Sequence, residues 1–437
     1  MKKFITTIRN IFSIEDLRVR ILNTIGFLIV FRLGSYIVLP GVDPDQLGAG
    51  AQGGIFDLLN TFLGGSFKRA SIFALGIMPY ISASIVIQLL TVAVPYFQKL
   101  QKEGESGRKK LTQITRVLTI VITLAQSAGY LATTIPAEAI LYSPSFFQVT
   151  SMIILVAGTM FCMWLGEKIT DKGIGNGISM LIMIGIISRL PGSLLNEMLD
   201  RGMSGALFFV LEIVALFFVV VGVVALTQAT RRIPIQYAKQ VIGNKLYGGK
   251  RDYIPLKINA SGVMPIIFAQ ALMFIPPLIA GIWKESEVGA YIGSTFSNPY
   301  SWQYNLLFGI LILLFTFFYT AITVNPNDIA DNLKRNGGFI PGIKPGKQTS
   351  EFIDEVLTRI TLPGSIFLAI VAILPAFAVQ AGVSSNFSQF YGGTSLLIMV
   401  GVILDTLQQI ESYLLMRHYE GMMKSGKVKG RSQTVAA

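Results

Sequence analysis

Histidine and cysteine, which most often serve as bases, nucleophiles or metal ligands, each occur once among these 437 residues. Cys162 has no second cysteine with which to form a disulfide within the chain, and two such residues cannot build a Cys/His metal cluster. A Ser-His-Asp triad would need His418, which lies in a basic tail. We therefore expect no hydrolytic site, no metal and no cofactor.

The nearest approach to a phosphate-binding loop runs from Gly243 to Lys250. It has an extra glycine and lacks the Ser or Thr that follows the lysine in a P-loop. If the protein performs work, we expect the energy to come from a partner or from a gradient.

Isoleucine recurs every four residues in two apolar segments, so that each set shares one face of a predicted helix. Such residues commonly pack helices together or face lipid. They also fit a dry constriction contributed by several helices, because rings of apolar side chains gate water and ions by dewetting. The two sets are Ile77, Ile81 and Ile85, and Ile178, Ile182 and Ile186.

The elements that carry these isoleucines are predicted to cross a membrane. Charged residues make up 14% of the chain, against roughly 25% in a soluble domain, and apolar residues make up 52%. A transmembrane helix needs about 20 apolar residues, and six uncharged runs reach that length. The sequence therefore predicts an all-α polytopic membrane protein rather than a disordered chain, a nucleic-acid-binding globule or a secreted disulfide fold. The ten predicted spans are 21–39, 70–94, 116–134, 149–166, 177–195, 205–226, 258–282, 305–324, 360–380 and 393–415.

Lysine and arginine alternate between the loops in a way that predicts the orientation. The N-terminal segment, every second loop and the C-terminal tail carry 30 of the 36 basic residues, and the opposite loops carry five. Both termini are therefore predicted to be cytoplasmic. Residues 1–20 are expected to form an amphipathic helix on the membrane surface, and the alternative for them is a flexible basic tail. Residues 416–437 are expected to form a basic cytoplasmic tail.

Two of the predicted cytoplasmic loops, 227–257 and 325–359, are long as well as basic. The first contains short β-like runs around Gly248-Gly249 and is expected to form a hairpin. The second has two turn clusters that flank a basic tip. Attraction to anionic lipids explains basic residues in short loops. It does not explain loops of this length, so we expect both to dock a large acidic or polyanionic partner.

A short internal repeat relates two of the predicted spans. The string Gly-Ile-Met-Pro-Tyr-Ile at 76–81 returns as Gly-Val-Met-Pro-Ile-Ile at 262–267, an offset of 186 residues. Paired Gly/Pro interruptions indicate a site on the axis between repeated halves. Five spans precede the second half, so it would be inverted in the membrane. A match of six residues can also arise by chance.

An apolar segment at 55–65 is helical in pattern but too short to span. Glycine pairs flank it, so it is expected either to be re-entrant and mobile or to lie on the outer surface. The charges inside predicted spans are single and widely separated, and we expect them to form structural ion pairs rather than a proton relay. They are Arg32, Glu212 and Asp405, with Glu411 near a cytoplasmic end.

Several long strings resemble the SecY family of protein-conducting translocon channels, in the family's order and over nearly the whole chain. They are Ser71-Ile-Phe-Ala-Leu-Gly-Ile-Met-Pro-Tyr-Ile-Ser-Ala-Ser84, Lys102-Glu-Gly-Glu-Ser-Gly-Arg108, Gly173-Ile-Gly-Asn-Gly-Ile-Ser179, Ala330-Asp-Asn-Leu-Lys334, Pro341-Gly-Ile-Lys-Pro-Gly346 and Gly392-Gly-Thr-Ser-Leu-Leu-Ile398.

The resemblance implies two pseudo-symmetric, inverted five-helix halves around a central hourglass pore, 21–195 and 205–415, with a hinge at 196–204. The implied function is a gated channel that passes unfolded proteins and releases transmembrane segments sideways into lipid. The implied pore ring is Ile77, Ile81, Ile182, Ile267 and Ile398. The implied plug helix spans 55 to about 67 and includes Phe56, Asp57, Leu58, Leu59, Asn60, Phe62 and Leu63. The implied lateral gate between spans two and seven carries Ser82, Gln88, Asn259 and Ile275.

The resemblance also implies partners and a location. SecE and SecG would be small membrane partners in a bacterial plasma membrane, and the long loops would dock the ribosome or the SecA ATPase. Clients would carry signal sequences, and no direct nucleic-acid specificity is expected. The implied contact residues are Arg231, Arg232, Lys239, Lys250, Arg251, Lys344 and Lys347.

Two positions and one short stretch depart from the family pattern. Lys344 stands where arginine is usual, and lysine cannot make arginine's planar bidentate contact. Asn327 stands where a basic residue is expected, and residues 48–54 are unusually rich in glycine.

An ion-coupled secondary transporter with inverted repeats is the alternative function. It predicts grouped polar or ionisable residues near the midplane, where this sequence offers isoleucines.

Overall fold

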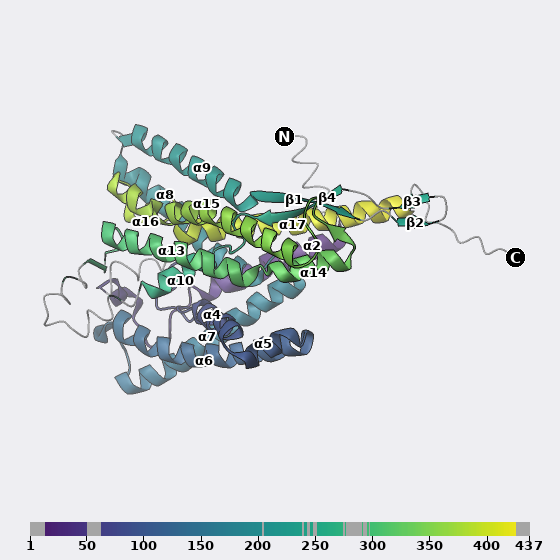
Figure 1. Ribbon diagram of the computed structural model, residues 1–437. Helices are drawn as coiled ribbons and strands as arrows, with labels where there is room; N and C mark the ends of the chain where they lie inside the picture. The colour runs from purple at the N-terminus through teal and green to yellow at the C-terminus, as the bar shows by residue number, and fades with distance from the viewer. Residues whose placement is uncertain are drawn as a thin grey trace. The chain divides into compact units, whose positions relative to one another are not determined.

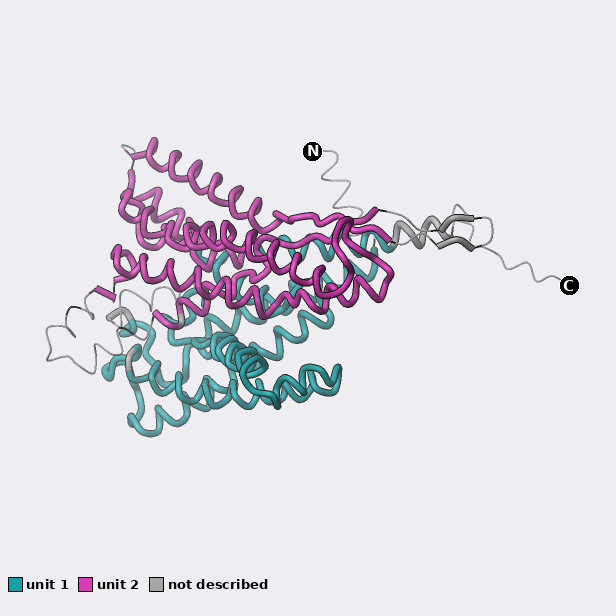
Figure 2. The backbone as a smooth tube through the Cα atoms, viewed as in Figure 1, with its two compact units in different colours: residues 1–189, 401–437 teal, residues 190–400 magenta. Residues whose placement is uncertain are grey.

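The computed structural model describes residues 14–49, 63–202, 205–237, 240–242, 245–247, 251–273, 276, 291, 295–296 and 298–424. The chain forms two compact units, one of residues 1–189 with 401–437 and one of residues 190–400 (Figure 2). The predicted segment 1–20 lies mostly outside the described residues, as do most of the predicted plug and the end of the tail. The predicted halves and their hinge stay a prediction.

The described residues of the first unit are mainly helical (Figure 1). They also include two short 3-10 turns. Helices α8 and α17 continue from this unit into the second, at residues 189–190 and 400–401. The elements are α2 (Glu15–Gly34), η1 (Pro44–Ala49), α4 (Met78–Ala93), α5 (Pro95–Lys102), α6 (Glu105–Thr134), η2 (Ala137–Ala139), α7 (Pro144–Lys172), α8 (Gly177–Arg201) and α17 (Gly393–Lys424).

The described residues of the second unit form helices and five strands. Its remaining helices are α9 (Ala206–Gln228), α10 (Met264–Leu272), α13 (Trp302–Thr323), α14 (Pro326–Arg335), α15 (Lys347–Gln380) and α16 (Ser385–Ser388). Its strands are β1 (Thr230–Tyr237), β2 (Gln240–Ile242), β3 (Lys245–Tyr247), β4 (Arg251–Lys257) and β5 (Gly338–Phe339).

Seven of the described helices are long and apolar enough to cross a membrane: α6, α7, α8, α9, α13 with α14, α15 and α17. Helices α4 and α5 pass the same test together, bent by 99° at the break before Pro95. A proline there breaks the helix because it lacks a backbone N–H and restricts the residue before it. The prediction of a helical multi-pass membrane protein is confirmed, and the count of ten spans stays a prediction.

Helix α9 illustrates why these helices need lipid. Its 23 residues expose large apolar side chains over most of its surface, and only Glu212 and Val223 are buried. A helix that is apolar all round is typical of a membrane span. In water the same surface would be an aggregation-prone patch. The exposed apolar residues include Leu207, Phe208, Leu211, Phe217 and Phe218.

The two long basic loops fold together into one substructure, here called the head, which comprises the described residues of 230–257 and residues 326–359. Strands β4, β1 and β5 form an antiparallel sheet in that order, and β2 pairs with β3. The predicted hairpin is present as two antiparallel pairs, β1 with β4 and β2 with β3. The turn predicted at Gly248-Gly249 lies outside the described residues.

The head has its own apolar core. Ile233 and Ile235 of β1 point inward and Pro234 between them is exposed, as expected for a strand with one buried face. Arg231 and Arg232, which precede the buried part of the strand, are exposed as well. Helices α14 and α15 cover the buried face. The buried core residues are Ile233, Ile235, Leu256, Leu333, Ile340, Ile353 and Leu357.

Candidate functional site: an apolar constriction and a basic head

Three of the five isoleucines expected in the ring lie in the first unit and belong to one apolar cluster. Ile77 directly precedes α4 and is 4% exposed, Ile81 lies one turn further on, and Ile182 lies on α8. Phe31 and Leu181 fill the same cluster. The helices therefore bring together residues that are more than 100 positions apart in the sequence.

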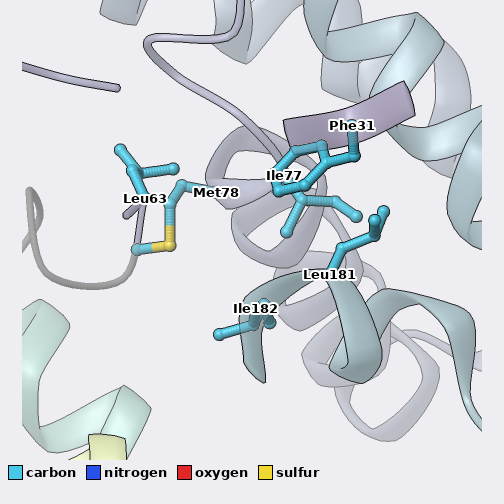
Figure 3. A pocket seen from close by; sticks show the side chains of 6 residues that line it. All are labelled: Phe31, Leu63, Ile77, Met78, Leu181 and Ile182. Carbon is cyan, nitrogen blue, oxygen red and sulfur yellow. The ribbon is translucent and has the colours of Figure 1, made fainter. Parts of the chain in front are cut away.

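A small hollow lies beside these isoleucines (Figure 3). Its space of about 10 Å³ is no larger than one water molecule requires. A buried water also needs two to four polar partners, and every lining side chain is apolar, so the hollow is dry. Of the seven residues named for the predicted plug, Leu63 lies in the part of the chain that the structure describes, and it contributes to the wall. The lining residues are Phe31, Leu63, Ile77, Met78, Leu181 and Ile182.

The repeated string adopts the same local structure at both places. Gly76 has φ +50° and α4 begins two residues later. In the same way, Gly262 has φ +64° and α10 begins two residues later. Left-handed φ values of this kind favour glycine. At Gly76 there is a second constraint, because a Cβ atom would lie 2.6 Å from Leu63 Cδ2. The glycine therefore permits Leu63 to approach the start of α4.

Ile267 and Ile398 lie in the second unit. Ile267 is half-buried on α10, and Ile398 is 9% exposed near the start of α17. The closed ring of five isoleucines stays a prediction.

The predicted gate residues fall on both units. Ser82 and Gln88 are half-buried on α4, and the Ser82 hydroxyl donates to the Met78 carbonyl at 3.2 Å. In the second unit Asn259 accepts a hydrogen bond from Ser261 at 3.3 Å. Ile275 lies outside the described residues, and the seam itself stays a prediction.

The head carries the described members of the predicted docking set on its surface. Arg231 and Arg232 begin β1, Arg251 begins β4, and Lys344 and Lys347 flank the start of α15, all five exposed. Lys239 and Lys250 lie outside the described residues. Asn327, one of the departures from the family pattern, also lies in the head. It accepts a 2.7 Å hydrogen bond from Ser350 and so joins α14 to α15.

Glu212 confirms the expectation of structural ion pairs. Its carboxylate pairs with Arg201 at the end of α8, and Arg201 also pairs with the buried Glu197 at 3.2 Å. Tyr391 donates to the Glu212 backbone carbonyl at 2.7 Å, and burial raises the pKa of this phenol. Sequence reasoning missed the partner because it placed Arg201 in a loop, whereas α8 continues to that residue.

Arg32 departs from the prediction that charges within the spans form structural ion pairs. It makes no ion pair within the described part of the chain, and its guanidinium donates instead to the Gly64 carbonyl and to the Tyr36 hydroxyl.

Long apolar helices, a dry isoleucine cluster and a basic head with its own core define a helical multi-pass membrane protein of the channel or transporter class. Comparison with known proteins narrows the class, since the SecY family model matches residues 71–407. This chain belongs to the SecY family. It is 41% identical to the protein translocase subunit SecY of Mycobacterium bovis, covering 97% of this chain and 100% of that one. It is 42% identical to the subunit of the same name from Streptomyces coelicolor, covering 96% and 100%.

Solved structures share the fold at lower identity. One described as "The structure of a protein conducting channel" matches with a TM-score of 0.62 at 16% identity, over 96% of this chain and 95% of the other. A SecY structure concerned with its plug domain and closed state gives 0.60 at 17% identity, with the same coverage. Sec61 in a canine ribosome-channel complex gives 0.59 at 15% identity, again over 96% and 95%.

Proposed function

We propose that this chain is the channel-forming subunit of a protein translocase, which conducts unfolded polypeptides across a membrane and releases transmembrane segments sideways into lipid. The observation that carries the proposal is the dry apolar cluster of Ile77, Ile81 and Ile182 in a chain whose full-length relatives are named translocase subunits. An apolar constriction binds no solute specifically, which suits a pore whose cargo varies in sequence, and it limits ion flow by dewetting.

In this proposal Ile267 and Ile398 complete the ring, and the segment at 55 to about 67 is the plug. The position of Leu63 beside Ile77 supports the plug assignment, because the end of that segment already lies against the ring residues. A related SecY structure is described as having a plug domain that stabilises the closed state and maintains a membrane seal.

Signal sequences and transmembrane segments would leave through a lateral gate between α4 and the span that contains α10. Ser82, Gln88 and Asn259 offer polar contacts for such a seam. Hydrogen bonds between transmembrane helices contribute only about 0.6 kcal/mol each, so a seam of this kind can open.

The head is the proposed docking surface for the ribosome and for the SecA ATPase. A ribosome-channel complex among the related structures supports the ribosome as a partner. The basic loops would then face the cytoplasm of a bacterium, with the chain in the plasma membrane alongside SecE and SecG. Anionic lipids would add to the attraction at about 1 kcal/mol per basic residue near the surface.

Site-specific photocrosslinking tests the conducting path. A photoreactive residue replaces Ile81 or Ile267 while a secretory precursor is stalled in mid-transport. We expect crosslinks to the precursor from both positions and their loss when the signal sequence is defective. Ile366 on α15 is 44% exposed and is the matched control, from which we expect crosslinks to lipid.

Absence of crosslinks from both ring positions, with the precursor shown to be engaged at the membrane, would overturn the proposed path. Gradient-driven uptake of a small solute by the reconstituted chain would then favour the transporter alternative.

A further inference from the structure

The connection between α7 and α8 is held by side chains from two other helices of the first unit. Its residues 173–175 are buried. The Ile174 amide donates to Thr24 Oγ1 of α2 at 3.0 Å, and the Gly175 amide donates to Gln409 Oε1 of α17 at 2.8 Å. These acceptors lie 150 and 234 positions away in the sequence. The pair of contacts that Thr24 and Gln409 make with this connection is here called the clasp.

Arg20 of α2 reinforces the clasp. Its Nη1 donates to the Gly173 carbonyl at 3.2 Å, and its Cζ atom lies 5.4 Å from the ring centroid of Tyr413 on α17, within the range of a cation–π contact. A cation is favourable beside the last carbonyls of α7, because the C-terminal end of a helix carries partial negative charge. The Arg20 carbonyl accepts the Thr24 hydroxyl hydrogen at 2.9 Å, which leaves the lone pairs of that hydroxyl to accept from the connection.

The backbone approaches these side chains too closely for any residue larger than glycine. A Cβ atom on Gly173 would lie 2.4 Å from Thr24 Oγ1, and one on Gly175 would lie 3.1 Å from Thr406 Oγ1 of α17. Gly175 also has φ +82°, a left-handed value that favours glycine. The connection is therefore fitted to α2 on one side and to α17 on the other.

The residue that follows the clasped segment begins α8. Asn176 Oδ1 accepts from the amides of Ile178 at 3.1 Å and Ser179 at 3.2 Å, which is an N-cap. Gly177 meets α7 directly, since a Cβ atom there would lie 1.9 Å from the Gly166 carbonyl oxygen. Because the clasp holds the two residues just before the cap, the place of the first turn of α8 depends on it.

That first turn leads to the isoleucine cluster. Ile182 lies five residues after Gly177, which is about 8 Å along a helix. Leu181 and Ile182 line the dry hollow beside Ile77 (Figure 3). A displacement at the start of a rigid helix is carried to a residue little more than one turn away, so the clasp can set where Ile182 lies.

We propose that Thr24 and Gln409 are positioning residues for the constriction: by holding residues 173–175 they set the place of Ile182 in the pore ring. This role rests on the proposed function, because it treats Ile182 as a ring residue. Gln409 lies on the helix that also carries Ile398. Under the proposed function α17 would contribute to the ring directly through Ile398 and indirectly through Gln409.

Substitutions that remove only the accepting oxygens test the clasp in the full chain within its reconstituted translocon. Thr24→Val and Gln409→Leu keep the approximate shape of each side chain, whereas Thr24→Ser and Gln409→Glu keep an accepting oxygen. We expect the amides of 178–182 to exchange with deuterium about tenfold faster in the first pair, the equivalent of one lost hydrogen bond. The second pair should exchange at nearly the wild-type rate, and resting ion leak through the vesicles should follow the same order.

A double-mutant cycle separates the positioning of Ile182 from a general loss of stability. Ile182→Ala should itself raise the resting leak. If Gln409 acts through Ile182, Gln409→Leu should add nothing to the leak of the Ile182→Ala chain. An effect on overall stability would instead add to the leak in both backgrounds.

Two matched controls change the same residue types outside the clasp. Gln408→Leu replaces the neighbouring exposed glutamine of α17. Thr112→Val replaces an exposed threonine of α6 whose hydroxyl donates to the Arg108 carbonyl of its own helix at 3.0 Å, as Thr24 does to Arg20. Both should leave exchange at 178–182 and the ion leak unchanged.

Unchanged exchange at 178–182 in both Thr24→Val and Gln409→Leu would overturn the proposal. So would a leak that Gln409→Leu raises by the same factor with and without Ile182→Ala, or an equal effect of the two conservative variants. A normal leak in Ile182→Ala, together with the local exchange effect, would instead remove Ile182 from the ring. The proposed function would then lose the observation that carries it, while the hold of the clasp on α8 would stand.

Discussion

Gln236 of β1 pairs with Phe339 of β5, and this pairing joins two loops that lie about 100 residues apart in the sequence. Without this pairing, the segments 230–257 and 326–359 would belong to separate loops. With it, they share one sheet and one apolar core. The proposed docking residues Arg232 and Lys344 therefore belong to a single folded surface.

Gly338→Ala should weaken the pairing between β1 and β5. A Cβ atom at this position would lie 2.6 Å from Leu333 Cδ1 and 3.2 Å from Tyr237 Cε1, so both side chains would have to shift and the packing of β5 against α14 and β1 would be disturbed. We expect faster hydrogen exchange at Tyr237 and Phe339 and easier proteolysis of 230–257. Gly26→Ala on α2 meets no atom within 4 Å and should change neither measurement.

Arg232→Glu should impair transport driven by SecA while leaving the amount of membrane-inserted protein unchanged. The side chain is exposed at the start of β1, outside the core of the head, so its reversal changes charge rather than folding. Precursor translocation into vesicles is the measurement, and Arg18→Glu is the matched charge reversal. Normal SecA-dependent transport in the Arg232 variant would remove this surface from the docking site.

Ile81→Ser and Ile267→Ser should wet the proposed constriction. A hydroxyl gives water a partner in a space that is otherwise dry, and we expect the resting ion leak of vesicles to rise by about tenfold, the equivalent of one hydrogen bond gained by water. Signal-sequence discrimination should weaken in parallel. Ile366→Ser on the exposed face of α15 is the control. A leak that stays at the wild-type level in both ring variants contradicts the gating role.

Arg201→Met should destabilise the second unit. It would leave Glu197 and Glu212 buried without their shared cation, and breaking a buried pair in this way costs about 3–5 kcal/mol. A lower thermal unfolding midpoint of the detergent-solubilised protein is the expected result. Arg359→Met removes an exposed pair with Glu355 and should cost less than about 1 kcal/mol. Equal effects of the two substitutions would contradict this reading of the network.

The sequence predicts the apolar spans well because each depends on a local run of residues. Predominantly apolar stretches located α6, α7, α9, α13, α15 and α17, although the helices extend beyond these stretches where polar residues continue the same backbone. The start of the second span was less accurate. Residues 63–77 form turns, and α4 begins only at Met78, after Gly76 takes a left-handed φ.

The contacts that join distant segments had no local signal. The two residues of β5 are too few to predict a strand, and they depend on pairing with the distant β1. The sequence places Arg69 and Arg201 in loops. Arg69 donates to the Gly64 carbonyl at 3.0 Å and Arg201 pairs with Glu212, and nothing near either arginine in the sequence indicates these partners. The isoleucine stripes, in contrast, follow helical spacing, so Ile77, Ile81 and Ile182 were found before any contact was known.

The apolar core beneath β1 has a kinetic consequence for the partners of the head. Since Ile233 and Ile235 anchor the strand, its backbone is already ordered at Arg231 and Arg232 before any partner arrives. Ordering a flexible loop on binding costs roughly 1–2 kcal/mol per residue in backbone entropy, and this strand avoids most of that loss. Charge attraction can then set the association rate. Two partners that need the same surface in turn would each find it preformed and could exchange rapidly.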